Sequence, residues 1–224
     1  MTRKEALRVI EIFPKGRFIR LLILLLGLLV LSPLFGEFYN FRILEGLFVT
    51  AIFIYAAYSL SRSKALAAAA IGLALPAVAL FWLKSFVDAR WVEIAGGLCA
   101  AVFMAVIITA ILRHIFLQKD VSADLIAGAI VSYLLMATMW SFIYYLLEAV
   151  RPGSFNLPAG TLYTQPALFR YFSLVTITTV GYGDITPVAP VARAFANLEA
   201  VVGQLYLVIL VSWLVGMYVS KKSK

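Results

Sequence analysis

The sequence predicts an all-α integral membrane protein with six transmembrane helices per chain and one short helix that enters the membrane and turns back. The 224 residues are 63% hydrophobic and only 13% charged, with a mean hydropathy of +0.98. This composition excludes an ordinary soluble globular protein. Apolar segments long enough to span a bilayer recur along the chain. A shorter apolar segment ends in a glycine-containing run near residue 180.

Each predicted span is an apolar run that polar or charged residues separate from the next run. The six runs are 18–35, 43–60, 65–83, 92–116, 123–147 and 191–219. The first ends at Ser32 and Pro33, and no clear small-residue cleavage site follows it. We therefore interpret it as a span and not as a secretion signal.

The distribution of Lys and Arg predicts how these spans are oriented. Basic residues gather before the first span, between the second and third, between the fourth and fifth, and after the sixth. On the other side, acidic residues dilute the basic ones. The positive-inside rule therefore predicts that both termini are cytoplasmic. It also explains the net charge of +8, so nucleic acid is not expected as a partner.

The basic segment 1–17 also carries the apolar residues Leu7, Ile10, Ile12 and Phe13. It could form an amphipathic helix that contacts anionic membrane lipids. Alternatively, it is a topology signal only.

Residues 176–184 read Thr-Ile-Thr-Thr-Val-Gly-Tyr-Gly-Asp. In an ordinary strand, successive backbone carbonyls point in alternating directions. All the carbonyls of a segment can point toward one common axis only if this alternation is broken, which requires backbone angles open mainly to glycine. Gly181 and Gly183 provide these angles, while Val180 and Tyr182 would point away from the axis. Thr179 would supply the innermost oxygens. The alternative is a Gly-Tyr-Gly turn beside a β-branched strand.

The residues before this run predict a short helix at 166–178. Pro166 suits the first helical position, where no backbone N–H is needed. About 13 residues cover roughly 20 Å, less than a bilayer core, so the chain enters the membrane and returns. Non-helical backbone is tolerated there if protein buries it or water lines it. The negative end of the helix dipole would favour a cation.

The run 179–183 resembles the selectivity filter of potassium channels, in which backbone carbonyls replace the hydration shell of K⁺. With its flanks it resembles the pore module of tetrameric potassium channels: outer helix, pore helix, filter and inner helix. With four spans before it, the chain resembles six-transmembrane channels of the voltage-gated type. The resemblance divides it into a cytoplasmic segment at 1–17, a four-helix transmembrane domain at 18–117 and a pore domain at 118–224.

The resemblance implies a potassium-selective channel that is not an enzyme. K⁺ would be the permeant ligand, bound at Thr179, Val180, Gly181 and Tyr182, and no cofactor is expected. Because the chain has one filter and no internal pore repeat, the resemblance implies a homotetramer, in which three further copies of the chain complete the pore. The expected location is the cell membrane, in a prokaryote the inner membrane.

The fourth predicted span departs from the voltage-gated pattern. Residues 92–116 carry no charge besides Glu93 at one end and Arg113 near the other. A charge is worth roughly 2.3 kcal/mol per 100 mV, so one terminal arginine supplies little gating energy. The sequence therefore predicts weak voltage gating or none.

The predicted support of the filter consists of Tyr171, Thr178, Asp184 and Glu199. In related channels, the acidic residue after Gly-Tyr-Gly is tied to the pore helix. Val175 stands where some members carry a carboxylate, so the bond would come from Tyr171, one turn earlier. The predicted bond joins the Tyr171 hydroxyl to Asp184. The alternative is a Tyr171 that packs at the membrane interface beside a solvated Asp184.

Two positions in the last span have alternative interpretations. Glu199 is an acidic residue inside an apolar span, and we favour a position behind the filter over a structural contact with Arg193 or Asn197. Gly203 is a candidate gating hinge, although close packing against a neighbouring helix is equally compatible with it.

Other function classes remain as alternatives. The channel could open only through a partner, lipid, pH or membrane tension, or the chain could be a membrane sensor or scaffold that keeps a pore fold without transport. An enzyme is the weakest alternative, since the sequence offers no nucleophile–base set or phosphate loop. Its single histidine, His114, and single cysteine, Cys99, make no metal site or intrachain disulfide.

Overall fold

The computed structural model describes residues 16–35, 41–59, 64–84, 86–87, 89–118, 120–158 and 165–222. Seven helices and one pair of short strands make up these residues. The helices are α2 (Arg17–Phe35), α3 (Phe41–Ser59), α4 (Lys64–Leu83), α5 (Arg90–Leu117), α6 (Ala123–Val150), α7 (Gln165–Ile177) and α8 (Pro190–Lys222), and the strands are β1 (Phe155–Asn156) and β2 (Thr186–Pro187). The predicted cytoplasmic segment 1–17 lies, except for its last two residues, outside the described part.

The helices coincide with the predicted segments to within a few residues. The short helix predicted at 166–178 corresponds to α7. Within the described part of the chain, three helices are long and apolar enough to cross a membrane: Arg90–Leu117, Ala123–Val150 and Pro190–Met217. For the first three predicted spans the structure has helices α2, α3 and α4, and their crossing of a membrane stays a prediction.

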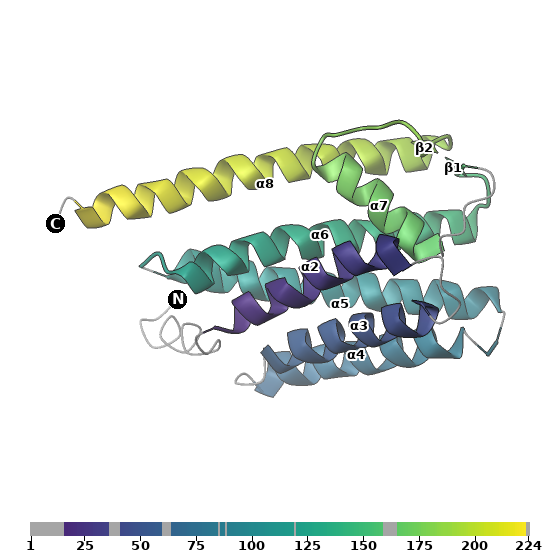
Figure 1. Cartoon of the computed structure of the whole chain (residues 1–224), viewed down its shortest axis with the longest axis horizontal. Helices are drawn as coiled ribbons and strands as arrows, with labels where there is room; N and C mark the ends of the chain where they lie inside the picture. The colour runs from purple at the N-terminus through teal and green to yellow at the C-terminus, as the bar shows by residue number, and fades with distance from the viewer. Residues whose placement is uncertain are drawn as a thin grey trace.

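Helix α6 is the common neighbour in the arrangement. Helices α2, α5, α7 and α8 all pack against it, while α4 packs on α5 and α3 packs on α2 and α4. The short α7 lies obliquely between α6 and α8, and the loop that follows it runs back along α8 (Figure 1). Helices α7 and α8 therefore lie on one side of α6, and α3, α4 and α5 lie on the other (Figure 1).

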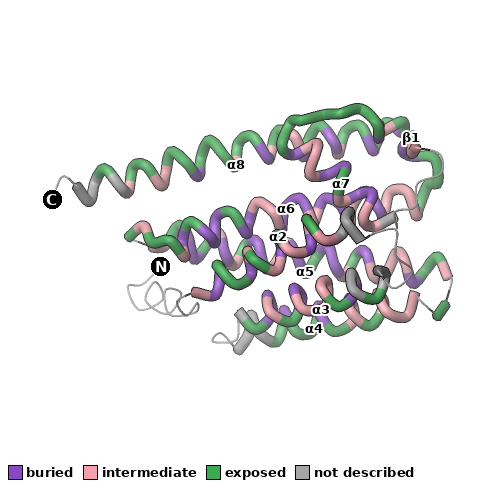
Figure 2. Tube along the Cα trace, viewed as in Figure 1, coloured by how far each residue is buried: buried purple, intermediate pink, exposed green. Residues whose placement is uncertain are grey.

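The core lies where α5 and α6 meet. Phe103, Ile107 and Ile111 of α5 are fully buried at helical spacing, as is Leu135 of α6. Helix α8 differs from α5 and α6 in its burial. In the most apolar 18-residue stretch of each helix, only 11% is buried in α8, against 44% in α5 and 56% in α6. Figure 2 shows α8 exposed along most of its length. A long apolar helix with so little cover implies an environment outside this chain.

The two strands, which the sequence analysis did not predict, tie the end of α6 to the segment after the glycine run. Phe155 pairs with Pro187 and Asn156 with Thr186, antiparallel. The Ser154 carbonyl accepts hydrogen bonds from the amides of Val188 and Ala189, at 2.8 and 3.1 Å. The chain is thus held on both sides of the run, by α7 before it and by this strand pair after it.

Candidate selectivity filter

The run Thr179–Gly183 is non-helical and lies exposed on the surface of the chain. Thr179, Gly181 and Gly183 have positive φ angles of 61°, 59° and 81°. Left-handed residues thus alternate with Val180 and Tyr182. Such alternation breaks the regular strand pattern of carbonyl directions, as predicted for the two glycines. The left-handed Thr179 was not predicted, because a β-branched residue rarely adopts this conformation.

The start of the run is fixed by the last turn of α7. The amides of Val180 and Gly181 both donate to the Val175 carbonyl, at 3.0 and 3.2 Å, and the Thr179 amide donates to Thr176 at 3.0 Å. These bonds satisfy helix carbonyls that would otherwise have no partner. Thr178 donates its hydroxyl to the Leu174 carbonyl at 2.5 Å. The backbone of the run is therefore continuous with a capped helix end.

Tyr171 joins α7 to the residue after the run. Its hydroxyl donates to Oδ2 of Asp184 at 2.7 Å, so the hydrogen bond predicted from the spacing is present. Oδ1 of Asp184 accepts the Ile185 amide at 3.1 Å. The ring of Tyr171 also stacks on that of Tyr182, with centroids 6.5 Å apart and an interplanar angle of 7°. One side chain of α7 thus contacts two residues of the loop.

Glu199 is fully buried between three helices. Its Oε2 accepts a hydrogen bond from the Tyr144 hydroxyl of α6 at 2.5 Å, and its Oε1 contacts the Ser173 hydroxyl of α7. The structural partners considered from the sequence are elsewhere: Arg193 donates to the Pro187 carbonyl at 3.1 Å, and Asn197 is exposed.

Sequence reasoning missed both partners of Glu199. Ser173 is a polar residue in a short apolar helix, and this contrast is a sequence signal for a buried hydrogen-bonding group. Tyr144 is one of several tyrosines, and the sequence offers no way to select it.

Gly203 lies directly against the C-terminal residue of α7. A Cβ at this position would be 2.5 Å from Cγ1 and 2.9 Å from the carbonyl oxygen of Ile177. The same carbonyl accepts a hydrogen bond from the Tyr133 hydroxyl at 2.9 Å. Helix α8 continues without a break through this position. The contact supports the close-packing interpretation, and the hinge stays a prediction.

Comparison with known proteins identifies this region. Residues 121–220 match the family model described as an ion channel. Two pore potassium channel c of Oryza sativa subsp. japonica is 43% identical over 68 residues, 30% of this chain and 14% of that protein. Voltage-gated potassium channel Kch of Escherichia coli (strain K12) is 32% identical over 127 residues, 56% of this chain and 27% of that protein. Over these residues the chain is similar to potassium channels.

A third potassium channel gives the same result. Inward rectifier potassium channel Kirbac3.1 of Paramagnetospirillum magnetotacticum is 33% identical over 84 residues, 36% of this chain and 25% of that protein. The matched part thus spans about a quarter or less of each of the three relatives. No solved structure matches the chain significantly. The relatives point to a channel and not to an enzyme.

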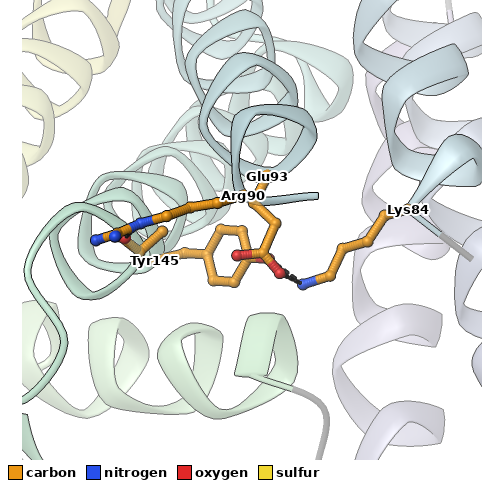
Figure 3. A network of polar contacts seen from close by, with 5 residues as sticks. Lys84, Arg90, Glu93 and Tyr145 are labelled. Carbon is orange, nitrogen blue, oxygen red and sulfur yellow. Dashed lines mark hydrogen bonds and ion pairs between the residues drawn. The ribbon is translucent and has the colours of Figure 1, made fainter. Parts of the chain in front are cut away.

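Charged residues at one end of the bundle connect α6, which lies in the matched region, to α5 and to the end of α4. Lys84, just after α4, contacts Glu93 of α5 and the Tyr145 hydroxyl of α6 (Figure 3). Burial disfavours its charged form, but the hydrogen bonds to Glu93 and Tyr145 outweigh this effect, and the pKa of Lys84 is raised above 10.5. Arg90 donates to the carbonyls of Ala149 and Val150, at 2.6 and 2.5 Å.

This network was not predicted, although its charged residues all fall at span ends on the predicted outer side. At the opposite end of α5, Phe116 meets Trp213 of α8, with ring centroids 5.2 Å apart. Near it, His114 is buried and its Nε2 lies 3.3 Å from Nε2 of Gln118. The described residues contain no group of three His, Cys, Asp or Glu side chains that could hold a metal.

Proposed function

We propose that this chain is a subunit of a potassium-selective channel that conducts K⁺ passively through the backbone carbonyls of Thr179–Gly183. The observation that carries the proposal is the alternation of left-handed residues in this run, directly after a capped short helix. Carbonyl groups turned toward one axis replace the water shell of K⁺. Thr179, Val180, Gly181 and Tyr182 would bind the ion, with no cofactor.

The exposed surfaces of a single chain support a homotetramer. One copy of the run cannot surround an ion, and Val180 and Tyr182 are 51% and 71% exposed in the isolated chain. The apolar surface of α8 is uncovered as well. Three further copies around one axis would bury these surfaces, with Val180 and Tyr182 forming the wall behind the carbonyls.

The other apolar surfaces suit membrane lipid. Exposed aliphatic side chains continue along the first helices, for example Ile23, Ile54 and Leu75. The Lys and Arg distribution supports cytoplasmic termini, with residues 18–117 forming a domain that does not sense voltage strongly. We propose a multi-pass protein of the cell membrane, in a prokaryote the inner membrane.

The deciding experiment reconstitutes the purified protein into liposomes. Uptake of radioactive rubidium, a K⁺ surrogate, is measured down a K⁺ gradient and compared with uptake of radioactive sodium. Light scattering after size-exclusion chromatography gives the oligomeric state in parallel. We expect a tetramer that passes rubidium and excludes sodium. A folded tetramer that passes no rubidium over a range of pH and voltage would favour the scaffold instead.

A further inference from the structure

The buried cluster around Glu199 contains five oxygen atoms in a row of close contacts. The Tyr144 hydroxyl lies 2.5 Å from Glu199 Oε2. Glu199 Oε1 contacts Ser173 Oγ, and Ser173 Oγ lies 2.7 Å from the Ala137 carbonyl oxygen. Tyr144, Ser173 and Glu199 are all fully buried. Each of the three contacts requires one hydrogen between its two oxygens.

The hydroxyl groups supply only two of these three hydrogens. Tyrosine and serine each carry one, while a backbone carbonyl and an ionised carboxylate carry none. The Tyr144 hydroxyl donates its hydrogen to Oε2. The Ser173 hydroxyl can donate its hydrogen either to the Ala137 carbonyl or to Glu199. If Glu199 were ionised, one of the two contacts of Ser173 would therefore join two buried oxygens with no hydrogen between them. A hydrogen on Oε1 completes the set: Glu199 donates to Ser173, and Ser173 donates to Ala137.

The surroundings of Glu199 also favour the neutral acid. The titratable groups of α6 that interact with Glu199 are Tyr144, which donates a hydrogen bond to it, and Tyr133, which is within electrostatic reach. The other titratable groups of α6, Asp124, Tyr145 and Glu148, form their hydrogen bonds with other residues in the described part of the chain. The charged side chains of α7 and of the first part of α8 are Arg170 and Arg193, and neither forms an ion pair with Glu199 among the described residues. A fully buried carboxylate without a cation is costly.

We infer that Glu199 is held as a neutral carboxylic acid, and that its proton positions the pore helix between the outer and inner helices. The chain of donors runs from Tyr144 of α6 to Glu199 of α8, then to Ser173 of α7 and back to Ala137 of α6. When Glu199 gives its proton to solvent base, Ser173 must turn its hydrogen to the carboxylate. The Ala137 carbonyl then loses its bond, and α7 loses this tie to α6.

This role extends the proposed function, because α7 carries both the capped start of the filter and Tyr171. Glu199 is a positioning residue and does not touch K⁺. Loss of its proton is expected to lower sustained K⁺ flux at alkaline pH. The protonation itself can be measured without any flux, so the two proposals are tested separately.

Infrared difference spectroscopy on the full-length purified protein tests the protonation. At neutral pH the wild type should show the C=O stretch of a protonated carboxylic acid, and Glu199→Gln should lack it. Glu93→Gln is the matched control and should keep the band, because Glu93 is ion-paired with Lys84. Absence of the band in the wild type, or its persistence in Glu199→Gln, would overturn the inference.

Ser173→Ala provides a second test that does not depend on the folding of Glu199→Gln. This variant keeps the acid but removes its hydrogen-bond acceptor, so the band should move to higher frequency. A band at an unchanged frequency would assign the proton to another carboxyl group and overturn the inference.

Rubidium flux against pH tests the positioning role. Wild-type flux should fall at alkaline pH, whereas Glu199→Gln should lose this dependence, because its amide N–H₂ donates to Ser173 at every pH. The same alkaline fall in both proteins would overturn the positioning role. Absence of flux in the wild type would instead overturn the proposed function, and the infrared result would still decide the protonation.

Discussion

The hydroxyl of Tyr171 donates a 2.7 Å hydrogen bond to Asp184, across the five residues of the proposed filter. Tyr171 belongs to α7, which precedes the filter, and Asp184 follows its last glycine. The bond therefore connects the helix before the proposed filter to the residue after it, in addition to the backbone that runs through the filter. Asp184 is further fixed by the Ile185 amide. A filter held at both ends keeps its carbonyl oxygens in place as ions pass.

Replacing Tyr171 by phenylalanine should weaken sustained conduction without unfolding the protein. The substitution removes a charge-assisted hydrogen bond, worth about 1 kcal/mol at this partly exposed position. Currents recorded during prolonged K⁺ conduction should decay faster than in the wild type. Tyr55→Phe is the matched control, because the Tyr55 hydroxyl has no hydrogen-bond partner among the described residues. Equal decay rates in all three proteins would contradict a supporting role for Tyr171.

Replacing Gly181 by alanine should abolish selective K⁺ current. A Cβ at Gly181 meets no described atom of this chain within 4 Å, but the φ angle of 59° strains any residue with a side chain. The cost is about 1–2 kcal/mol per residue, repeated in each subunit. Gly153→Ala, at a φ angle of 81° with open space around it, carries the same strain away from the filter. Normal K⁺ over Na⁺ selectivity in Gly181→Ala would show that the filter assignment is wrong.

Replacing Gly203 by alanine should lower thermal stability. The added Cβ would approach the backbone oxygen of Ile177 to 2.9 Å, and overpacking typically costs about 1–3 kcal/mol. Gly216→Ala, where the Cβ meets nothing within 4 Å, should gain up to about 1 kcal/mol from helix propensity. Unfolding midpoints in detergent measure both. A more stable Gly203→Ala protein would rule out the close contact with Ile177.

Channel opening should depend only weakly on voltage. Helix α5 has no charged residue between Glu93 and Arg113, and Glu93 is held in the ion pair with Lys84. The charge moved should be about one elementary charge per subunit or less. The slope of open probability against voltage, from purified channels in planar bilayers, measures it. A slope that requires several charges per subunit would contradict this prediction.

Hydropathy and one motif were sufficient to predict the positions of the helices. Long apolar runs and their charged ends reflect the cost of polar groups in a membrane, which acts locally along the chain. The motif predicted the left-handed glycines, because glycine is the residue for which these angles are cheap. The bond from Tyr171 to Asp184 was predictable because related channels tie this acidic residue to the pore helix, and helical spacing places Tyr171 on the same face as Val175 and Thr179.

The remaining features depend on contacts between distant segments. Thr179 takes a left-handed angle against its own preference, in a turn held by bonds to α7. The β1–β2 pair has strands of two residues each, too short for any periodicity. The contact of Ser173 with Glu199 joins residues 26 apart, and only the crossing of α7 and α8 brings them together.

The bond from Arg90 to the end of α6 has a mechanical consequence. The guanidinium donates to the carbonyls of the last two residues of α6, so the start of α5 and the end of α6 stay together at this end of the bundle. Helix α5 has 28 residues and is therefore about 42 Å long. If it turns as a rigid rod by about 5°, its far end sweeps roughly 4 Å. That end carries Phe116 against Trp213, so a slight tilt of the first helices becomes a sideways push on the free half of α8.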